Sequence, residues 1–299
     1  MKIRSLNIHG LKQRLYVWGN PRKPKLFFFH GWLDTGAAFQ FVAEHLQRDF
    51  YCLAPDMRGF GKSGHIRNPL GYFFYEYVAD MHELFRQWSP RQAVRLVAHS
   101  LGGAVAAIYA GTFPERVSHL VNIEGYLIPR REPSVVPERG RLWLESLGKK
   151  RFRFFKTLEA FARRLQKSNP RLPWERALFL ARHLGKRGSR GWTMAADPKH
   201  KLIEPYWTPL EAHEACWAKI EAKCLLVSVK NSEMAARFGA ADFAAEKRAR
   251  EAHFPAGTRV ETISDCGHMV HHEKPEVLAE LIRGFLGKTH LNPSTSAIE

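Results

Sequence analysis

Long apolar runs are absent from this sequence of 299 residues. No stretch approaches the roughly 18 uninterrupted apolar residues that indicate a membrane-spanning helix. The opening residues, MKIRSLNIHG, lack an apolar segment behind their charges, so no secretory signal is predicted. Cysteine is scarce, and Cys52, Cys216, Cys224 and Cys266 are too widely separated for a paired metal-binding spacing. We therefore expect reduced thiols in a cytoplasmic protein.

Acidic residues are also in short supply, with 29 Asp and Glu against 46 Lys and Arg and a formal net charge of +17. Much of the excess lies in residues 126–220. A field of this sign attracts anions. However, no zinc-finger spacing and no RNA-recognition aromatic signature accompanies it, so no specific nucleic-acid partner is predicted. We expect a solvated basic surface whose contacts with anionic surfaces are at most weak.

What the sequence does contain is an alternation of short apolar stretches with segments of helical periodicity. The expected strands are residues 26–29, 50–53, 94–98, 119–123, 224–229 and 259–263. The expected helices are residues 36–47, 75–88, 101–112, 235–251 and 275–286. This alternation predicts an α/β fold with a mostly parallel sheet and helices on both faces. Residues 3–19 predict an antiparallel hairpin at one edge of that sheet.

The alternation stops in the middle of the chain, where the sequence is basic and punctuated by proline. We interpret residues 126–215 as a helical cap inserted into a core formed by residues 1–125 and 216–299. Eight aromatic residues of the insertion could line an apolar acyl pocket, although packing between helices is the more common use of such side chains. They are Trp143, Phe152, Phe154, Phe155, Phe161, Trp174, Phe179 and Trp192.

A serine occupies the junction between an expected strand and an expected helix. Ser100 lies in the pattern A-H-S-L-G, close to the G-x-S-x-G pattern of a nucleophile elbow. Gly102 and Gly103 would let the helix pack tightly against the strand. Leu101 would offer its backbone N–H to an oxyanion at the helix N-terminus. Taken alone, an ordinary turn that happens to carry a serine is the alternative.

Three further motifs follow other strands. In FFFHGWLD, Gly31 allows a sharp turn and Trp32 can present a second N–H to the same oxyanion. PDMRGFGKSG is rich in glycine, but it lacks the G-x-x-x-x-G-K-[ST] spacing of a phosphate-binding loop. Near the C-terminus, Gly267 and His268 lie between a strand and a helix. That position would bring a catalytic histidine to the edge of the sheet where Ser100 lies.

The motifs HGWLD, PDxRGxGxSG, HSxGG and GHxxxxExPE occur in one order along nearly the whole chain. In this the sequence resembles the α/β-hydrolase fold family, and HGWLD together with VSHLVNIEG is most similar to its serine-hydrolase-like branch. The resemblance implies that Ser100 is the nucleophile and that His268 is the general base which takes its proton. It implies no metal and no organic cofactor. His271 and His272 compete with His268 for this role, but we expect them at a surface beside a helix.

The carboxylate that orients the histidine is where this sequence departs from the common family pattern. Most members place an aspartate after the strand that corresponds to residues 224–229, where this chain has Ser232. A second known position, at the end of the preceding strand, is used by haloalkane dehalogenases and some lipases, and Glu124 falls there. We assign Glu124 as the acid. The alternatives are Glu233, no working acid, or a Glu124 that only pairs with a basic residue of the insertion.

A serine nucleophile argues against the haloalkane dehalogenases and epoxide hydrolases, which share the HGW motif but use an aspartate nucleophile. We expect a serine hydrolase, specifically a carboxylesterase that acts on small to medium apolar acyl esters through an acyl-enzyme on Ser100. The N–H groups of Trp32 and Leu101 would hold the oxyanion. Hydrolysis of a lactone, a thioester or a C–C bond is an alternative within this fold. A non-catalytic ligand-binding member is the alternative from another class.

Overall fold

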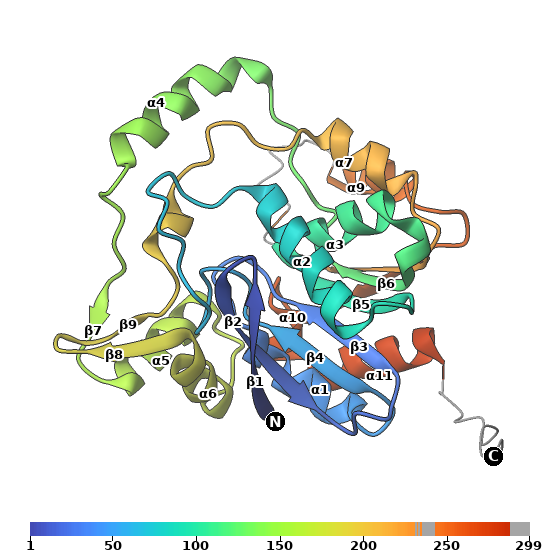
Figure 1. The fold of residues 1–299 in the computed structure, drawn as a ribbon, viewed down its shortest axis with the longest axis horizontal. Coiled ribbons are helices and arrows are strands. Elements are labelled where there is room, and N and C mark those ends of the chain that lie inside the picture. The colour runs from blue at the N-terminus through green and yellow to red at the C-terminus, as the bar shows by residue number, and fades with distance from the viewer. Residues whose placement is uncertain (231, 233, 235–242, 288–299) are drawn as a thin grey trace.

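An eight-stranded sheet forms the centre of the computed structural model, which describes residues 1–230, 232, 234 and 243–287. The strand order is β1-β2-β4-β3-β5-β6-β10-β11 (Figure 1). The strands are β1 (Lys2–Ile8), β2 (Leu11–Trp18), β3 (Lys25–Phe29), β4 (Tyr51–Pro55), β5 (Val94–His99), β6 (Val117–Ile123), β10 (Lys223–Val229) and β11 (Arg259–Ile263). Strand β2 pairs antiparallel with β1 and β4, and the remaining pairs are parallel. The predicted edge hairpin and mostly parallel sheet are confirmed.

Both faces of the sheet are buried, which explains why the central strands are continuously apolar. In β3, Phe27 and Phe29 pack into the core on one face, whereas Leu26 and Phe28 pack into the core on the other. This alternation follows from the two-residue period of a strand. Each face therefore needs its own layer of helices.

Helices supply those two layers. On the first face lie α2 (Phe74–Trp88), α3 (Leu101–Thr112) and α7 (Leu210–Trp217), and on the second lie α1 (Gln40–Leu46) and α11 (Pro275–Leu286). A 3-10 turn, Gly36–Phe39, precedes α1 where the sequence predicts one continuous helix. Helix α9 (Phe243–Glu251) matches the end of the helix predicted over residues 235–251. Residues 235–242 of that prediction lie outside the described part of the chain.

The insertion between β6 and β10 contains helices α4 (Val136–Ser146), α5 (Leu158–Ser168) and α6 (Trp174–Leu184). It also contains a three-stranded antiparallel sheet of β7 (Phe154–Phe155), β9 (Gly191–Met194) and β8 (Gly185–Gly188). The insertion is helical as predicted, but the sequence did not indicate this small sheet. Its strands are two to four residues long. Strand β8 consists of glycine and basic residues, β9 begins with glycine, and none of the three strands shows the apolar alternation that predicts a strand.

Most aromatic side chains of the insertion pack against one another or against the core. Phe161 is buried in a cluster between α5 and α6, and Phe155, Trp174 and Phe179 pack around it. Helix α4 has no buried residue and stands apart from the other helices (Figure 1). The predicted boundary at residue 215 falls inside α7, which packs on α3. The division into core and cap stays a prediction.

All four cysteines are free thiols, as their spacing predicts. Among the described helices, none combines the length and the apolarity needed to span a membrane.

Candidate active site

Ser100 lies at the junction of β5 and α3 in a strained backbone conformation. Its φ of 51° and ψ of −118° are rare for a residue other than glycine. The surroundings hold it there, because the Ser100 N–H donates to the Ile123 carbonyl at 2.8 Å and its own carbonyl accepts from Ala104 N–H at 3.0 Å. Such strain is typical of functional sites. The sharp turn sets the hydroxyl at the carboxyl end of the central strands.

Two glycines allow the helix behind the serine to approach the sheet. A Cβ atom on Gly102 would lie 2.5 Å from the Phe29 carbonyl oxygen, and one on Gly103 would lie 2.9 Å from the Gly125 Cα. Any side chain at either position would push α3 away from the strands. The close packing predicted from the sequence is therefore present.

The structure brings Ser100, His268 and Glu124 together, although they come from three separate segments of the chain. His268 follows β11, and its Nε2 lies 3.0 Å from the Ser100 Oγ. Its Nδ1 lies 2.6 Å from the Glu124 Oε2. Glu124 follows β6 and is buried, and its Oε1 accepts from the Val229 backbone N–H at 3.1 Å. Among the described residues, Glu124 thus pairs with the histidine and not with a basic residue of the insertion.

The other candidate position for the acid, after β10, carries a serine in this chain. Ser232 stands where most family members have an aspartate, and its hydroxyl accepts from the Met234 backbone N–H at 3.1 Å. Glu233 lies outside the described residues.

This arrangement suits proton transfer. A carboxylate only accepts hydrogen bonds, so Glu124 fixes the His268 proton on Nδ1 and leaves the Nε2 lone pair facing the serine hydroxyl. An imidazole in that tautomer can take the hydroxyl proton when the oxygen attacks a substrate. The chemical capacity of the site is therefore that of an activated serine.

The two predicted oxyanion donors lie beside this serine. Leu101 is the first residue of α3, so its N–H has no acceptor within the helix. Trp32 follows β3, and a Cβ atom on the preceding Gly31 would lie 3.1 Å from the Ser100 Cβ. The two segments are thus in contact at the serine. The oxyanion role of both residues stays a prediction.

A pocket of about 160 Å³ opens next to these donors. Trp32 and Leu101 form part of its lining, and α4 contributes Trp143, whose Nε1–H donates to the Leu70 carbonyl at 3.0 Å. The other lining residues are Leu70, Gly71, Tyr72, Phe73, Phe74, Tyr77, Lys199, His200, Leu202, Glu204 and Pro205. The pocket is therefore largely aromatic and is shared between the core and the insertion.

Two titratable side chains in this lining were not identified from the sequence. His200 stacks between Phe60 and Tyr72, with ring centroids 3.6 and 3.9 Å away, and burial lowers the pKa of His200 to about 3. Burial raises the pKa of Glu204 to about 7. His200 lies in a four-residue 3-10 helix, Pro198–Lys201, and Glu204 lies in an irregular segment, so no periodic pattern could have indicated that they face a pocket.

The glycine-rich loop after β4 has a structural role. Arg58 is buried, and its guanidinium donates to Asp80 through Nε at 2.7 Å and to Glu76 through Nη1 at 2.6 Å. Both acids belong to α2. The loop therefore holds the start of α2 against the sheet, in agreement with the absence of a phosphate-loop spacing.

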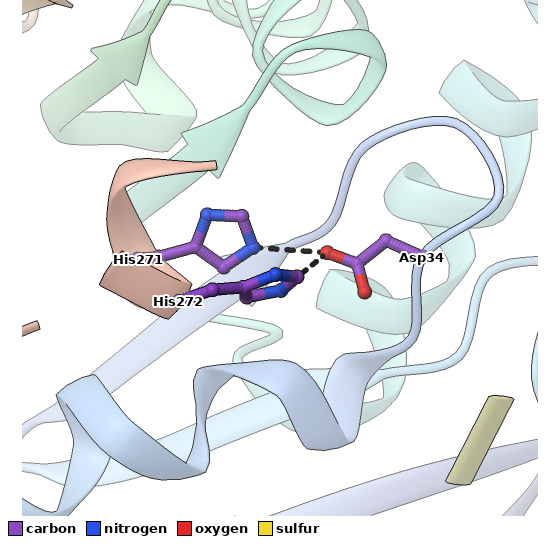
Figure 2. A group of neighbouring side chains, drawn as sticks. All are labelled: Asp34, His271 and His272. Atoms are coloured by element: carbon purple, nitrogen blue, oxygen red, sulfur yellow. Dashed lines mark hydrogen bonds and ion pairs between the residues drawn. The ribbon is translucent and has the colours of Figure 1, made fainter. Parts of the chain in front are cut away.

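The prediction that His271 and His272 lie at a surface was wrong. Both are buried on the short helix α10 (Val270–Glu273), and their Nε2 atoms lie 2.9 and 3.2 Å from the Asp34 Oδ2 (Figure 2). Their partner Asp34 is 237 residues from His271 in the sequence. No local pattern could have indicated this pairing.

Comparison with known proteins gives one consistent result. A family model described as the alpha/beta hydrolase fold matches residues 24–275. Serine hydrolase-like protein 2 of Homo sapiens is 25% identical over 299 residues, which cover 93% of this chain and 91% of that protein. The serine hydrolase-like protein of Danio rerio is 24% identical over 278 residues, covering 90% and 83%. A solved thioesterase domain from the curacin biosynthetic pathway has a TM-score of 0.84 at 24% identity, covering 94% of this chain and 99% of that one.

Proposed function

This chain belongs to the α/β-hydrolase fold family, near its serine-hydrolase-like branch, and from that premise we propose that it is a serine hydrolase of carboxylic esters. One observation carries the proposal. Ser100, His268 and Glu124 form a continuous chain of contacts from hydroxyl to imidazole to carboxylate. Such a chain turns a poor nucleophile into an active one.

The proposed acylation uses Ser100 as nucleophile and His268 first as base and then as acid. The Ser100 Oγ attacks the ester carbonyl while the His268 Nε2 takes its proton. The carbonyl oxygen becomes an oxyanion, which the N–H groups of Trp32 and Leu101 stabilise. His268 then gives the proton to the departing alcohol, and the acyl group remains on Ser100. Glu124 stays ionised throughout and stabilises the imidazolium.

Deacylation repeats these steps with water in place of serine. His268 removes a proton from the water, whose oxygen attacks the acyl carbonyl. When the tetrahedral intermediate collapses, the proton returns to the Ser100 Oγ and the carboxylic acid leaves. The first and last states of the enzyme are therefore identical.

The lining of the pocket favours a substrate with an apolar acyl group. Its lining is mainly aromatic and aliphatic, and its volume of about 160 Å³ suits a small to medium chain. We include in the proposal that residues 126–215 act as a cap, because Trp143 and the segment from Lys199 to Pro205 line the pocket beside the core residues Trp32 and Leu101.

Hydrolysis of p-nitrophenyl esters of increasing acyl length tests this function. We expect turnover by the intact chain and none by Ser100→Ala. Ser118→Ala should retain it, because the Ser118 hydroxyl contacts the Val94 carbonyl at 3.1 Å and the His119 Nδ1 at 3.2 Å and neither His268 nor Glu124 in the described hydrogen bonds. A fluorophosphonate should label the intact chain, and Ser100→Ala and His268→Ala should both abolish labelling. A folded protein that hydrolyses none of the esters and resists the probe would instead be a ligand-binding member of the fold.

A further inference from the structure

A buried cluster of Asp34, His271 and His272 lies behind the candidate active site and takes no part in the proposed mechanism. Asp34 belongs to the loop after β3, and both histidines project from α10 toward its carboxylate (Figure 2). The side chains of Asp34, His271 and His272 are 2%, 0% and 4% exposed. One atom from each residue can be chosen so that all three lie within 4.8 Å of one another.

The cluster leaves polar atoms without partners. Asp34 Oδ1 and His271 Nδ1 are buried and accept or donate no hydrogen bond. A carboxylate buried this deeply beside two imidazole rings is costly unless a positive charge offsets it.

Among the residues that the structure describes, no guanidinium or ammonium group pairs with the Asp34 carboxylate. Within the described part of the chain, the ion-pair partners of Asp34 are His271 and His272 alone. Arg176 comes near, but its Nη1 donates to the backbone carbonyl of His272 at 2.9 Å and not to the carboxylate.

We propose that Asp34, His271 and His272 form a binding site for a divalent transition-metal ion of the Zn²⁺ type. Two imidazole nitrogens and a carboxylate are a donor set that such ions prefer. The separations of 2.9 and 3.2 Å between the Oδ2 and the two Nε2 atoms match those of neighbouring ligands about 2.0–2.1 Å from one ion. The free Asp34 Oδ1 provides a fourth donor atom if the carboxylate binds through both oxygens.

The protons of the cluster are also compatible with an ion. His271 faces a carboxylate that only accepts, so without an ion its proton is on Nε2. On binding, that nitrogen donates its lone pair to the ion and the proton moves to Nδ1. The neighbouring His99 donates from Nε2 to the His268 carbonyl at 2.8 Å, which leaves its buried Nδ1 as an unpartnered acceptor. The His99 and His271 ring centroids are 4.4 Å apart. When the His271 proton moves to Nδ1, it therefore lies beside the His99 ring, whose Nδ1 can accept a hydrogen bond.

The site would have a structural effect. Asp34 lies two residues after Trp32, and His271 lies three residues after His268. An ion held by both segments would join the loop of a predicted oxyanion donor to the segment of the predicted base. Since all three ligands are buried, it would not contact substrate. The site stands on its own geometry, so the proposed hydrolase activity and the metal site can fail independently.

The test is a titration of the full chain, first dialysed against EDTA, with Zn²⁺ in competition with a chromogenic chelator. We expect one bound equivalent in the intact chain. His271→Gln and His272→Gln should each weaken binding by about tenfold or more. His213→Gln is the matched control, because His213 is a buried histidine on α7 outside the cluster, and it should bind as the intact chain does.

The triad histidine is the competing ligand and gives the decisive comparison. If His268→Gln loses the bound equivalent and His271→Gln keeps it, the ion sits at the triad and the proposal is overturned. The absence of a bound equivalent at micromolar Zn²⁺ overturns it as well. Should the cluster variants fail to fold, X-ray absorption of the Co²⁺-loaded intact chain decides the question. Two imidazole ligands support the proposal, and one imidazole contradicts it.

Discussion

At the scale of single residues, Glu124 illustrates how a carboxylate can serve a histidine from an uncommon position. Its Oε2 meets the His268 Nδ1 at 2.6 Å, while its Oε1 is fixed by the Val229 N–H. Replacing it with glutamine keeps the size but presents an amide that cannot stabilise an imidazolium. We expect Glu124→Gln to lower kcat on the order of 10⁴-fold while the protein stays folded.

The control for this prediction is Glu233→Gln, which changes the other candidate acid. It should lose less than about tenfold, since nothing in the His268 contacts requires a second carboxylate. Both variants are assayed on one ester at one pH, with circular dichroism to verify folding. The reverse ranking would place the acid after β10.

Residues that carry local motifs were predictable from the sequence, and residues whose partners are remote were not. Ser100 and His268 were identified because an elbow and a Gly-His loop have fixed spacing beside a strand. Glu124 required an additional argument, that the carboxyl ends of parallel strands meet at one edge. Asp34 and its two histidines gave no signal, because burial of His271 depends on a residue at the other end of the chain.

At the scale of elements, the pocket lining makes the stability of the fold depend on pH. Burial raises the pKa of Glu204 from its ordinary value of 4.5 to about 7. The folded state therefore keeps a proton between about pH 4.5 and 7 that the unfolded chain releases, and the free energy of unfolding falls as pH rises through this window. We expect Glu204→Gln to remove that decrease, as measured by Tm at several pH values.

Glu211→Gln is the control for this pH dependence. The Glu211 side chain is exposed and pairs with Arg130 at the surface, so its loss should leave the slope of Tm against pH unchanged. Equal slopes for the intact chain and Glu204→Gln would show that Glu204 titrates normally.

A buried ion pair holds the loop after β4 against α2. Arg58 donates to Asp80, which also accepts from the Gln13 side-chain amide at 2.6 Å. Removing one partner leaves the other charge buried, so we expect Asp80→Ala to lower the free energy of unfolding by about 3–5 kcal/mol. Urea denaturation measures this. Glu83→Ala, which removes a pair between a half-buried Glu83 and the exposed Arg86 on the same helix, should change little. An equal loss in both variants would contradict the role of burial.

Elements with a clear apolar period were predicted closely. Helix α11 has the predicted bounds, 275–286, because it shows helical periodicity and begins with a proline. Helix α3 also has the predicted bounds, 101–112, but it is buried on all sides and was placed by the serine turn that precedes it. The β7-β9-β8 sheet was missed because its pairing depends on turns at glycine and not on buried alternation. Apolar periodicity arises because one face of an element is buried. Where an element buries little surface, as in this small sheet, the sequence carries no such pattern.

At the scale of the whole molecule, the two ends of the insertion lie next to each other. Arg130 follows β6, and it pairs with Glu211 and Glu214 of α7, so residues 130 and 211 lie side by side. Between them the chain extends into α4, the small sheet and the α5–α6 pair (Figure 1). Tyr126 and α7 pack into the core instead. The segment between these two ends is residues 132–208, which is shorter than the predicted cap, although Ala196 within it packs into the core.

Replacing residues 132–208 with a short Gly-Ser linker tests whether this segment selects substrates. The replacement leaves Ser100, His268 and Glu124 on the core but removes the part of the pocket formed by Trp143 and the segment from Lys199 to Pro205. An acetyl ester needs little of that lining, whereas a longer acyl chain loses apolar contacts worth roughly 25 cal/mol per Å² of buried surface. We expect kcat/KM to fall more for hexanoyl and octanoyl esters than for acetate. If a folded replacement keeps the chain-length preference of the intact protein, selection resides in the core, and the aromatic lining from the insertion only shields the site from solvent.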